Sequence, residues 1–533
     1  MKNYDAIVIG AGAGGGVAAG KLAAAGKHVL LLERGRAQTF EDIGRDLLRN
    51  QRVNAHGHNA GPDSRHPRVA VDHSGEPVVV PPWDYRYQAN AATVGGGTRV
   101  YAGQAWRFHP LDFKMASTYG VPDGSSLADW PIRYEDLAPF YEKVEHELGV
   151  SGDCTHMQHL PKYARNYPMP PVPRTRRGEL MRAGAESLGW NTFPVPLAIN
   201  SQPNYGRPAC PGCQHCVGFA CPVDAKNGTQ NTFIPLALAS GKCELATDAI
   251  VERVEHLDGH ATGATYFTSG GQRVRAMADV IVVAAGAVES ARLLLNSGLG
   301  NDLVGRNLQG HVYISAFGLL ADDVWDGIGP GVTTATTRWS HGNPGIVGGG
   351  LMCDDGIILP TAYFRWAFPA SKRRWGSDAK NWMRHSYRRM LQVLGPIQDI
   401  PSPDARVSID PQVRDHWGIP VARLSGATHP ESIKTARFLH SKAVEWLKAC
   451  GALEVWGDPP PAPYLSGGQH QAGTCRMGDD PATSAVDRNG KLHGSDNIYL
   501  ADSSVHVTNG GFNPFLTAMA NSYRTITLLL GKW

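Results

Sequence analysis

The sequence predicts an α/β protein built on a parallel sheet, and three observations lead to this fold class. Residues 6–9 form a short apolar run that is followed at once by glycines and then by an alanine-rich segment, 17–25. A second apolar run follows at 29–32. A third, at 281–284, again precedes a glycine and a helical segment. Short apolar runs of this kind are typical of strands buried on both faces, so segments far apart in the chain are expected to share one sheet.

The glycines after the first strand predict a site for a dinucleotide. Gly10 permits a tight turn, Gly12 lets a pyrophosphate approach the backbone, and Gly15 lets the helix pack closely on the strand. The N-terminus of the helix presents unpaired N–H groups to the phosphates. Glu33 ends the second strand, where its carboxylate is placed to accept hydrogen bonds from both ribose hydroxyls. An acidic residue there disfavours a 2′-phosphate, and this unit by itself is compatible with FAD or NAD.

Two later segments are expected to reach the same ligand. Gly95, Gly96 and Gly97, followed by Thr98, predict backbone that wraps closely around a flat or charged group. The turn at Ala285 ends the third strand, and a helical segment follows it. The long stretches between these segments are left to form a substrate region.

The last part of the chain adds a strand and a helix to this unit. Residues 498–501 form an apolar run that ends at Asp502, whose carboxylate is placed to accept from a ribityl hydroxyl. Pro514 and Phe515 precede a helical stretch at 518–530. Backbone amides at the N-terminus of that helix are expected to face a flavin carbonyl and stabilise negative charge on it.

Composition and charge narrow the class of protein. Of the 533 residues, 42% are hydrophobic and 19% are charged, which is ordinary for a globular enzyme. The net charge of +3 argues against nucleic acid and anionic membranes as partners. No run reaches the roughly 18 apolar residues that span a bilayer, and no signal peptide is readable before the first strand. We therefore expect a cytoplasmic protein without a transmembrane segment.

Taken in order along the chain, these motifs resemble the glucose–methanol–choline (GMC) oxidoreductases, and the resemblance covers nearly the whole sequence. It rests on the N-terminal cradle, the Gly95 segment, Val251 in an expected strand, the Ala285 turn and a His470…Asn513 pair. The segment that begins Trp106-Arg-Phe is similar to the bacterial sugar branch of the family. That branch includes glycoside 3-oxidases, pyranose oxidases and the flavin subunits of glucose and gluconate dehydrogenases. The resemblance implies FAD as the cofactor.

The resemblance also implies the GMC fold and its division of the chain. A Rossmann-like FAD-binding domain with a parallel sheet is expected to be discontinuous, covered by a flap, and joined to an α+β substrate domain whose antiparallel sheet is covered by helices. The FAD-binding domain would comprise residues 1–36, 83–115, 210–310 and 466–533. The flap would comprise 37–82, and the substrate domain 116–209 and 311–465.

In the family, a histidine and a second histidine or asparagine face N5 of the flavin across the substrate. These positions correspond to His470 and Asn513. His470 would take the hydroxyl proton while hydride passes to N5, because neutral imidazole is a base near pH 7. The Asn513 amide would donate to the same oxygen. Val100 or Tyr101 stands where some relatives carry a histidine bonded to FAD, so the FAD is expected to be non-covalent.

Four cysteines crowd into a short segment and leave three interpretations open. Their spacing is close to that of ferredoxins, with one extra residue before the last cysteine. An iron–sulfur cluster, a zinc site and thiols without metal are all compatible with the pattern, and no metal is predicted. The cysteines are Cys210, Cys213, Cys216 and Cys221.

Aromatic and basic residues are interleaved at 363–368 and 373–389, and this pattern allows two interpretations. Aromatic faces stack on the C–H side of pyranose rings, which favours a lid over a sugar. The other interpretation is a helix whose aromatic residues are simply buried.

Together these features predict an enzyme that oxidises a secondary hydroxyl of a sugar or glycoside to a ketone, with carbon 3 favoured. Its electrons would pass to oxygen, a quinone or another carrier. The alternative is an iron–sulfur-containing flavin subunit of a membrane-linked sugar dehydrogenase, which would pass electrons to a cytochrome or quinone. A lyase that keeps FAD for structure belongs to a different class, and reduction of the flavin by substrate would exclude it.

Overall fold

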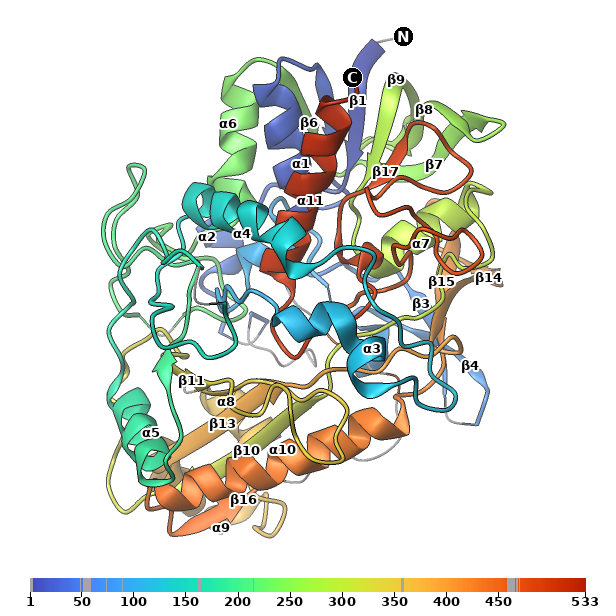
Figure 1. Cartoon of the computed structure of the whole chain (residues 1–533). Coiled ribbons are helices and arrows are strands. Elements are labelled where there is room, and N and C mark those ends of the chain that lie inside the picture. The colour runs from blue at the N-terminus through green and yellow to red at the C-terminus, as the bar shows by residue number, and fades with distance from the viewer. Residues whose placement is uncertain are drawn as a thin grey trace.

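A computed structural model describes residues 3–47, 49–50, 59–72, 74–88, 90–161, 164–213, 215–355, 359–457, 465, 468 and 470–533. Within these residues the strands form sheets of seven, six and four strands. In Figure 1 the seven-stranded sheet lies at the top beside both termini, and the six-stranded sheet lies at the bottom. Residues 51–58 of the expected flap fall outside this description, as do most of residues 458–469, which span the boundary between the expected substrate region and the last FAD-binding segment.

The seven-stranded sheet contains the strands that the sequence predicted. Its order is β6-β2-β1-β9-β8-β7, with β17 also paired to β9. The strands β6, β2, β1, β9 and β17 are parallel, whereas β7 and β8 run antiparallel to their neighbours. The bounds are β1 Asn3–Ile9, β2 Val29–Leu32, β6 Cys243–Ala246, β7 Ile250–Leu257, β8 His260–Phe267, β9 Arg273–Val283 and β17 Ile498–Leu500.

Burial on both faces explains the continuous apolar runs in this sheet. Ile7 and Ile9 of β1 belong to one core cluster, and Ala6 and Val8 belong to another. Because alternate side chains of a strand point to opposite faces, each face has its own core. In Figure 1 the helices α6 (Phe233–Ala239), α1 (Ala13–Ala24) and α11 (Phe515–Leu530) stand side by side over one face, and α7 (Ala287–Asn296) lies on the other side of the sheet. The helix α4 (Tyr134–Leu148) packs against α11, although the sequence assigned its segment to the substrate region.

The six-stranded sheet is antiparallel, as the resemblance implied. Its order is β16-β10-β13-β12-β11-β5. One face packs against the helices α10 (Pro430–Ala449) and α5 (Arg176–Ser187), through a core that includes Ile314 and Trp446. The other face contributes Tyr313 and Leu394 to a cavity that the loops of the seven-stranded sheet also line. The bounds are β5 Phe193–Pro194, β10 Tyr313–Leu319, β11 Thr334–Thr336, β12 Met352–Asp354, β13 Met390–Pro396 and β16 Glu454–Trp456.

Two strands of the four-stranded sheet, β3 and β4, lie within the expected flap at 37–82. β3 pairs with β4 on one side and with β15 on the other, and β15 pairs with β14. Buried Arg68 on β3 bonds Glu289 on α7 at 2.6 Å, which ties this sheet to the seven-stranded sheet. The bounds are β3 Arg68–Val71, β4 Pro77–Val80, β14 Arg406–Arg414 and β15 Pro420–Ser425.

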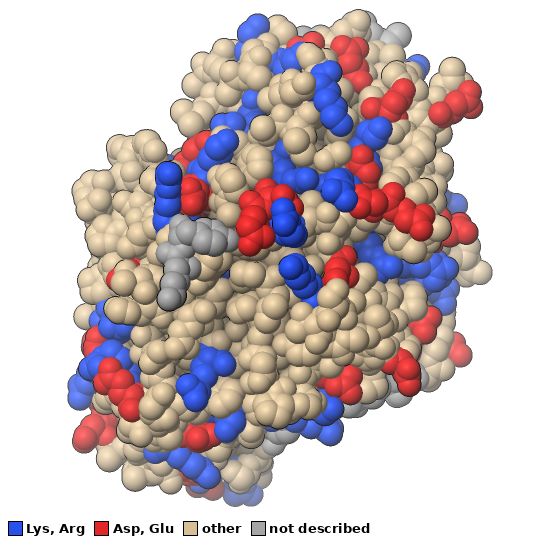
Figure 2. All heavy atoms as spheres, in the orientation of Figure 1, with Lys and Arg blue, Asp and Glu red and all other residues tan. Residues whose placement is uncertain are grey.

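The remaining helices of the described part of the chain are mostly short. None of its helices is both long enough and apolar enough to cross a membrane. On the face in Figure 2, basic and acidic side chains are interspersed with uncharged surface. The remaining helices are α2 Phe40–Ile43, α3 Met115–Tyr119, α8 Pro360–Ala362, α9 Gly376–Ser386, the 3₁₀ helices η1 Tyr85–Tyr87, η2 Gly96–Arg99, η3 Pro110–Lys114, η4 Thr229–Asn231, η6 Tyr387–Arg389 and η7 Ser503–Val505, and the π-helix η5 Tyr363–Ala367.

Candidate active site

A cavity of about 690 Å³ joins the glycine loops of the seven-stranded sheet to the inner face of the six-stranded sheet. All but two of the site residues predicted from the sequence form its wall; the exceptions are Gly15 and Gly95. We call the end lined by Gly12 and Glu33 the nucleotide end, and the end lined by Tyr313 and His470 the histidine end. The predicted residues in the wall are Gly10, Gly12, Glu33, Gly96, Gly97, Thr98, Val251, Ala285, His470, Asp502, Asn513, Pro514 and Phe515.

The three glycines of the first loop have different surroundings. Gly10 has a φ of +103°, and a Cβ there would lie 2.4 Å from the carbonyl oxygen of Ala284. A Cβ on Gly15 would lie 1.8 Å from the carbonyl oxygen of Gly10, so Gly15 packs α1 onto the loop. A Cβ on Gly12 would meet no protein atom within 4 Å. The backbone at Gly12 is therefore open to a ligand in the cavity.

The second glycine segment is held against the first. The Gly95 amide donates to the Ala11 carbonyl at 2.8 Å. A Cβ on Gly96 would lie 2.9 Å from the Cα of Gly12, so the two backbones pack with little space between them. Thr98 Oγ1 donates to the Gly95 carbonyl at 2.7 Å, which closes the turn. Gly95 thus shapes the wall from behind, although it does not line the cavity.

Two buried carboxylates fix the loops at the nucleotide end. Glu33 accepts from the amides of Ala11 at 2.9 Å and Gly35 at 2.8 Å, and burial raises its pKa. Asp502 accepts from the Gly286 amide at 2.8 Å and from Ser290 Oγ at 2.6 Å. A carboxylate offers about four acceptor positions, so each keeps capacity for ligand hydroxyls.

At the histidine end, four side chains from three segments meet. Nδ1 of His470 lies 2.8 Å from Nδ1 of His311 and 3.1 Å from the hydroxyl oxygen of Tyr313. The same Tyr313 hydroxyl accepts from Nδ2 of Asn513 at 3.4 Å. Oδ1 of Asn513 is buried and accepts no hydrogen bond within the part of the chain that the structure describes. A hydroxyl of a bound ligand can satisfy this oxygen.

His311 fixes which nitrogen of His470 carries a hydrogen. Burial lowers the pKa of His311 to about 4, so its ring is neutral near pH 7. Its Nε2 lies 2.9 Å from the Gly510 carbonyl oxygen and therefore donates to it. Nδ1 of His311 is then an acceptor, and Nδ1 of His470 must donate to it. In neutral His470 the nitrogen without a hydrogen is Nε2, which is the atom that can act as a base.

Sequence reasoning missed His311 and Tyr313. Both lie in the segment Gly310-His-Val-Tyr, whose second and fourth residues point the same way where β10 begins. The signal available was this alternation of two polar aromatic rings around a buried valine, Val312. It could not show that His470 lies opposite them.

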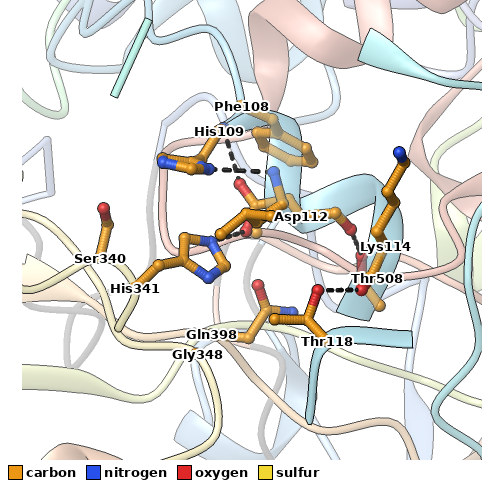
Figure 3. A network of polar contacts seen from close by, with 12 residues as sticks. Phe108, His109, Asp112, Lys114, Thr118, Ser340, His341, Gly348, Gln398 and Thr508 are labelled. Carbon is orange, nitrogen blue, oxygen red and sulfur yellow. Dashed lines mark hydrogen bonds and ion pairs between the residues drawn. The ribbon is translucent and has the colours of Figure 1, made fainter. Parts of the chain in front are cut away.

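A second polar network supports the backbone that holds His311. Figure 3 shows His109, Asp112 and His341 beside Thr508. Asp112 contacts Nε2 of His341 at 3.0 Å and accepts from the His109 amide at 2.8 Å. Thr508 Oγ1 donates to the Asp112 carbonyl at 2.8 Å. Because Gly510 follows two residues later, this network positions the carbonyl that receives the His311 hydrogen.

The four crowded cysteines are unpaired thiols in the structure. Cys216 is buried, and burial raises its pKa to about 12. The buried ammonium of Lys226 donates to the carbonyls of Tyr101, Cys216 and Phe219, and thereby holds the cysteine loop against the Gly95 segment. Among the described residues, no group of three or more His, Cys, Asp or Glu side chains is arranged to hold a metal ion.

Comparison with known proteins gives matches along the chain. Models of the GMC oxidoreductase family match residues 4–313 and 401–522. A 6‴-hydroxyparomomycin C oxidase from Streptomyces lividus is 31% identical over 98% of this chain and 90% of its own. A paromamine 6′-oxidase from Streptomyces fradiae is 28% identical over 99% of this chain and 91% of its own. A crystal structure of a pyridoxine 4-oxidase from Mesorbium loti superposes with a TM-score of 0.65 at 17% identity, covering 99% of both chains.

Proposed function

The chain belongs to the GMC oxidoreductase family, and from this premise we propose that it oxidises a hydroxyl group of a sugar or glycoside with FAD as the electron acceptor. The observation that carries the proposal is the arrangement of His470, His311, Tyr313 and Asn513 at one end of a cavity whose other end is made of glycine backbone. The two Streptomyces relatives, named as oxidases of aminoglycosides, support a sugar-like substrate.

Proteins of this family bind FAD, and the residues of this cavity fit it. The open backbone at Gly12 and the α11 N-terminus at Phe515 suit a pyrophosphate and a flavin carbonyl. Glu33 and Asp502 would bind its hydroxyl groups. The Tyr101 hydroxyl donates to the Asn227 carbonyl at 2.6 Å, and Tyr101 and Val100 both line the cavity, which supports FAD held without a covalent bond.

When bound, FAD supplies the acceptor for the hydride that leaves the substrate carbon. The chain itself handles the proton. As the carbon–hydrogen bond breaks, the substrate O–H bond must also break so that its electron pair can form the carbonyl. Nε2 of His470 takes that proton, because the hydrogen bond to His311 keeps the other ring hydrogen on Nδ1. The buried Oδ1 of Asn513 and its remaining N–H orient the hydroxyl groups of the sugar.

Carbon 3 remains the proposed position of attack. The printed names of the two Streptomyces relatives place their reactions at position 6′ or 6‴. Carbon-13 NMR of the product distinguishes oxidation at carbon 3 from oxidation at carbon 6, because a ketone carbon and an aldehyde carbon have different chemical shifts.

The first test is an anaerobic visible spectrum of the purified protein, titrated with glucose and aryl glycosides. We expect the flavin bands to bleach with sugar and to return in air. A flavin that no sugar bleaches contradicts the proposal. Bleaching without recovery in air, together with iron in the protein, would instead identify the iron–sulfur dehydrogenase subunit, with electrons passing to a cytochrome or quinone.

A further inference from the structure

We propose that a second cavity, of about 800 Å³, binds a second sugar ring of the substrate, joined by a glycosidic bond to the ring that is oxidised. This inference rests on the proposed function, because the first ring must lie at the histidine end. The substrate class would then be disaccharides or larger glycosides rather than free monosaccharides.

The second cavity continues the first along one face of the antiparallel sheet. Val217, Trp366 and Leu394 line both cavities. Tyr313 lines the first, and Ser315 and Phe317 line the second. Alternate residues of a strand share a face, so these three side chains of β10 form one row. The row extends about 13 Å from Tyr313 to Phe317 at about 3.3 Å per residue, which is longer than one sugar ring.

Gln392 provides an unused polar group in the wall of this cavity. It stands opposite Phe317 in the β10–β13 register. Its Nε2 donates to Ser315 Oγ at 2.9 Å, which fixes the amide plane. Its Oε1 is buried and receives no hydrogen bond from any described residue, and Gln392 as a residue is only 7% exposed. A buried carbonyl oxygen without a partner is costly, and a sugar hydroxyl is a donor of the right size.

Aromatic side chains supply the complementary apolar surface. Trp366, from the π-helix η5, is 43% exposed and lies where the two cavities meet. Trp456 stacks on Phe317 with ring centroids 5.8 Å apart, and its indole N–H donates to the Ala367 carbonyl at 2.7 Å. Tyr363 and Phe368 are buried, as the burial interpretation predicts, whereas Trp366 and Trp375 are exposed. Fixed aromatic faces beside a polar acceptor suit a pyranose ring.

Binding of glucose, maltose and cellobiose tests the proposal without turnover. We would measure it by calorimetry on the FAD-loaded His470→Gln protein. We expect at least one disaccharide to bind about tenfold more tightly than glucose, because ring stacking and one added hydrogen bond contribute about 1.4 kcal/mol together. Gln392→Leu should remove most of that preference and leave glucose affinity unchanged, because Gln392 lines only the second cavity. Trp366→Ala alters the wall that the two cavities share, so it should weaken disaccharide binding more than glucose binding. With His470 intact, the same preference should appear in the rate of anaerobic flavin bleaching.

Matched controls separate this site from general damage. Gln398 is also buried with an unpaired Oε1 among the described residues, but it lines neither cavity, so Gln398→Leu should keep the disaccharide preference. Trp375, 65% exposed and outside both walls, is the control for Trp366. Equal affinity for one and two rings, or an equal loss for both in Gln392→Leu, overturns the second site alone. If glucose neither binds nor bleaches the flavin and the disaccharides behave likewise, the proposed function fails with it.

Discussion

The two ends of the main cavity are built by opposite means. The nucleotide end is made mainly of backbone, from the glycine loops and a helix N-terminus. The side chains of two carboxylates hold the amides of these loops in place. The histidine end is made of side chains whose protons are fixed by hydrogen bonds. Substitutions at the nucleotide end should therefore act through steric contact and appear in stability or cofactor binding. Substitutions at the histidine end should act through proton position and appear in rate and pH dependence.

The largest expected effect is at the histidine end. In His470→Gln, flavin reduction by sugar should slow by about 10²–10⁴-fold, because a positioned base contributes that much. FAD content and the unfolding temperature should not change, since the side chain lines a cavity. His493→Gln is the control, because His493 contacts Ser484 at 2.9 Å outside the cavity wall. Stopped-flow spectrophotometry measures both, and a His470→Gln rate within tenfold of the wild type contradicts the assignment.

Two alanine substitutions then test the nucleotide end. Gly15→Ala places a Cβ against the Gly10 carbonyl and should lower the free energy of unfolding by about 3 kcal/mol or more, because neither backbone can move aside. Gly12→Ala meets no protein atom, so the FAD-free protein should keep its stability while FAD binding weakens. Thermal unfolding of the FAD-free protein and FAD titration separate the two. If the two variants are equally stable without FAD, the contact with the Gly10 carbonyl does not exclude a side chain at position 15.

Replacing His311 should have a smaller effect on the rate than replacing His470. His311→Leu removes the acceptor for Nδ1 of His470 and should slow flavin reduction about tenfold, with little change in KM, by allowing the wrong tautomer. His311→Asn keeps an acceptor near that place and should recover part of the rate. The pH profile of kcat/KM should shift in the leucine variant and less in the asparagine variant. Identical rates and profiles in both would mean that His311 only fills space.

The smallest expected effect is on stability in acid. Burial lowers the pKa of His311 and His506 to about 4, whereas an unfolded histidine has a pKa of about 6.5. Between these values the two histidines bind more protons in the unfolded chain, so their contribution to stability is greatest above pH 6.5 and falls as the pH drops toward 4. Burial raises the pKa of Glu33, so its contribution to stability has the opposite pH dependence. This contribution is present below the pKa that Glu33 has in the unfolded chain and is lost as the pH rises above that value. Between pH 7 and pH 5 the unfolding temperature of His311→Asn should fall by a few degrees less than that of the wild-type protein. If the unfolding temperature of the variant changes with pH as it does in the wild type, His311 does not contribute to the loss of stability in acid.

The fold class, the family and the glycine loops could all be predicted from the amino-acid sequence. The strand at 29–32 has the predicted bounds, and the runs at 6–9 and 281–284 predicted the ends of β1 and β9, which begin earlier, at Asn3 and Arg273. These runs could be recognised because burial on both faces and the glycine turns after the strands are local properties. The helix expected from 518 begins at 515, because its first residues form the turn that faces the cavity. The site residues proposed from the sequence remain proposals, although the structure gathers most of them in one wall.

The assembly of the histidine end could not be predicted, because it depends on contacts between segments that lie far apart in the chain. His311, His470 and Asn513 lie outside the strands, in segments far apart in the chain that meet around Tyr313, and no local pattern records that contact. The same holds for the second cavity, where Gln392 meets Ser315 through the register of β10 and β13. A backbone site can be predicted from the residues that form its turn. A proton position depends on which distant atoms fix the ring, and those atoms become neighbours only when the chain has folded.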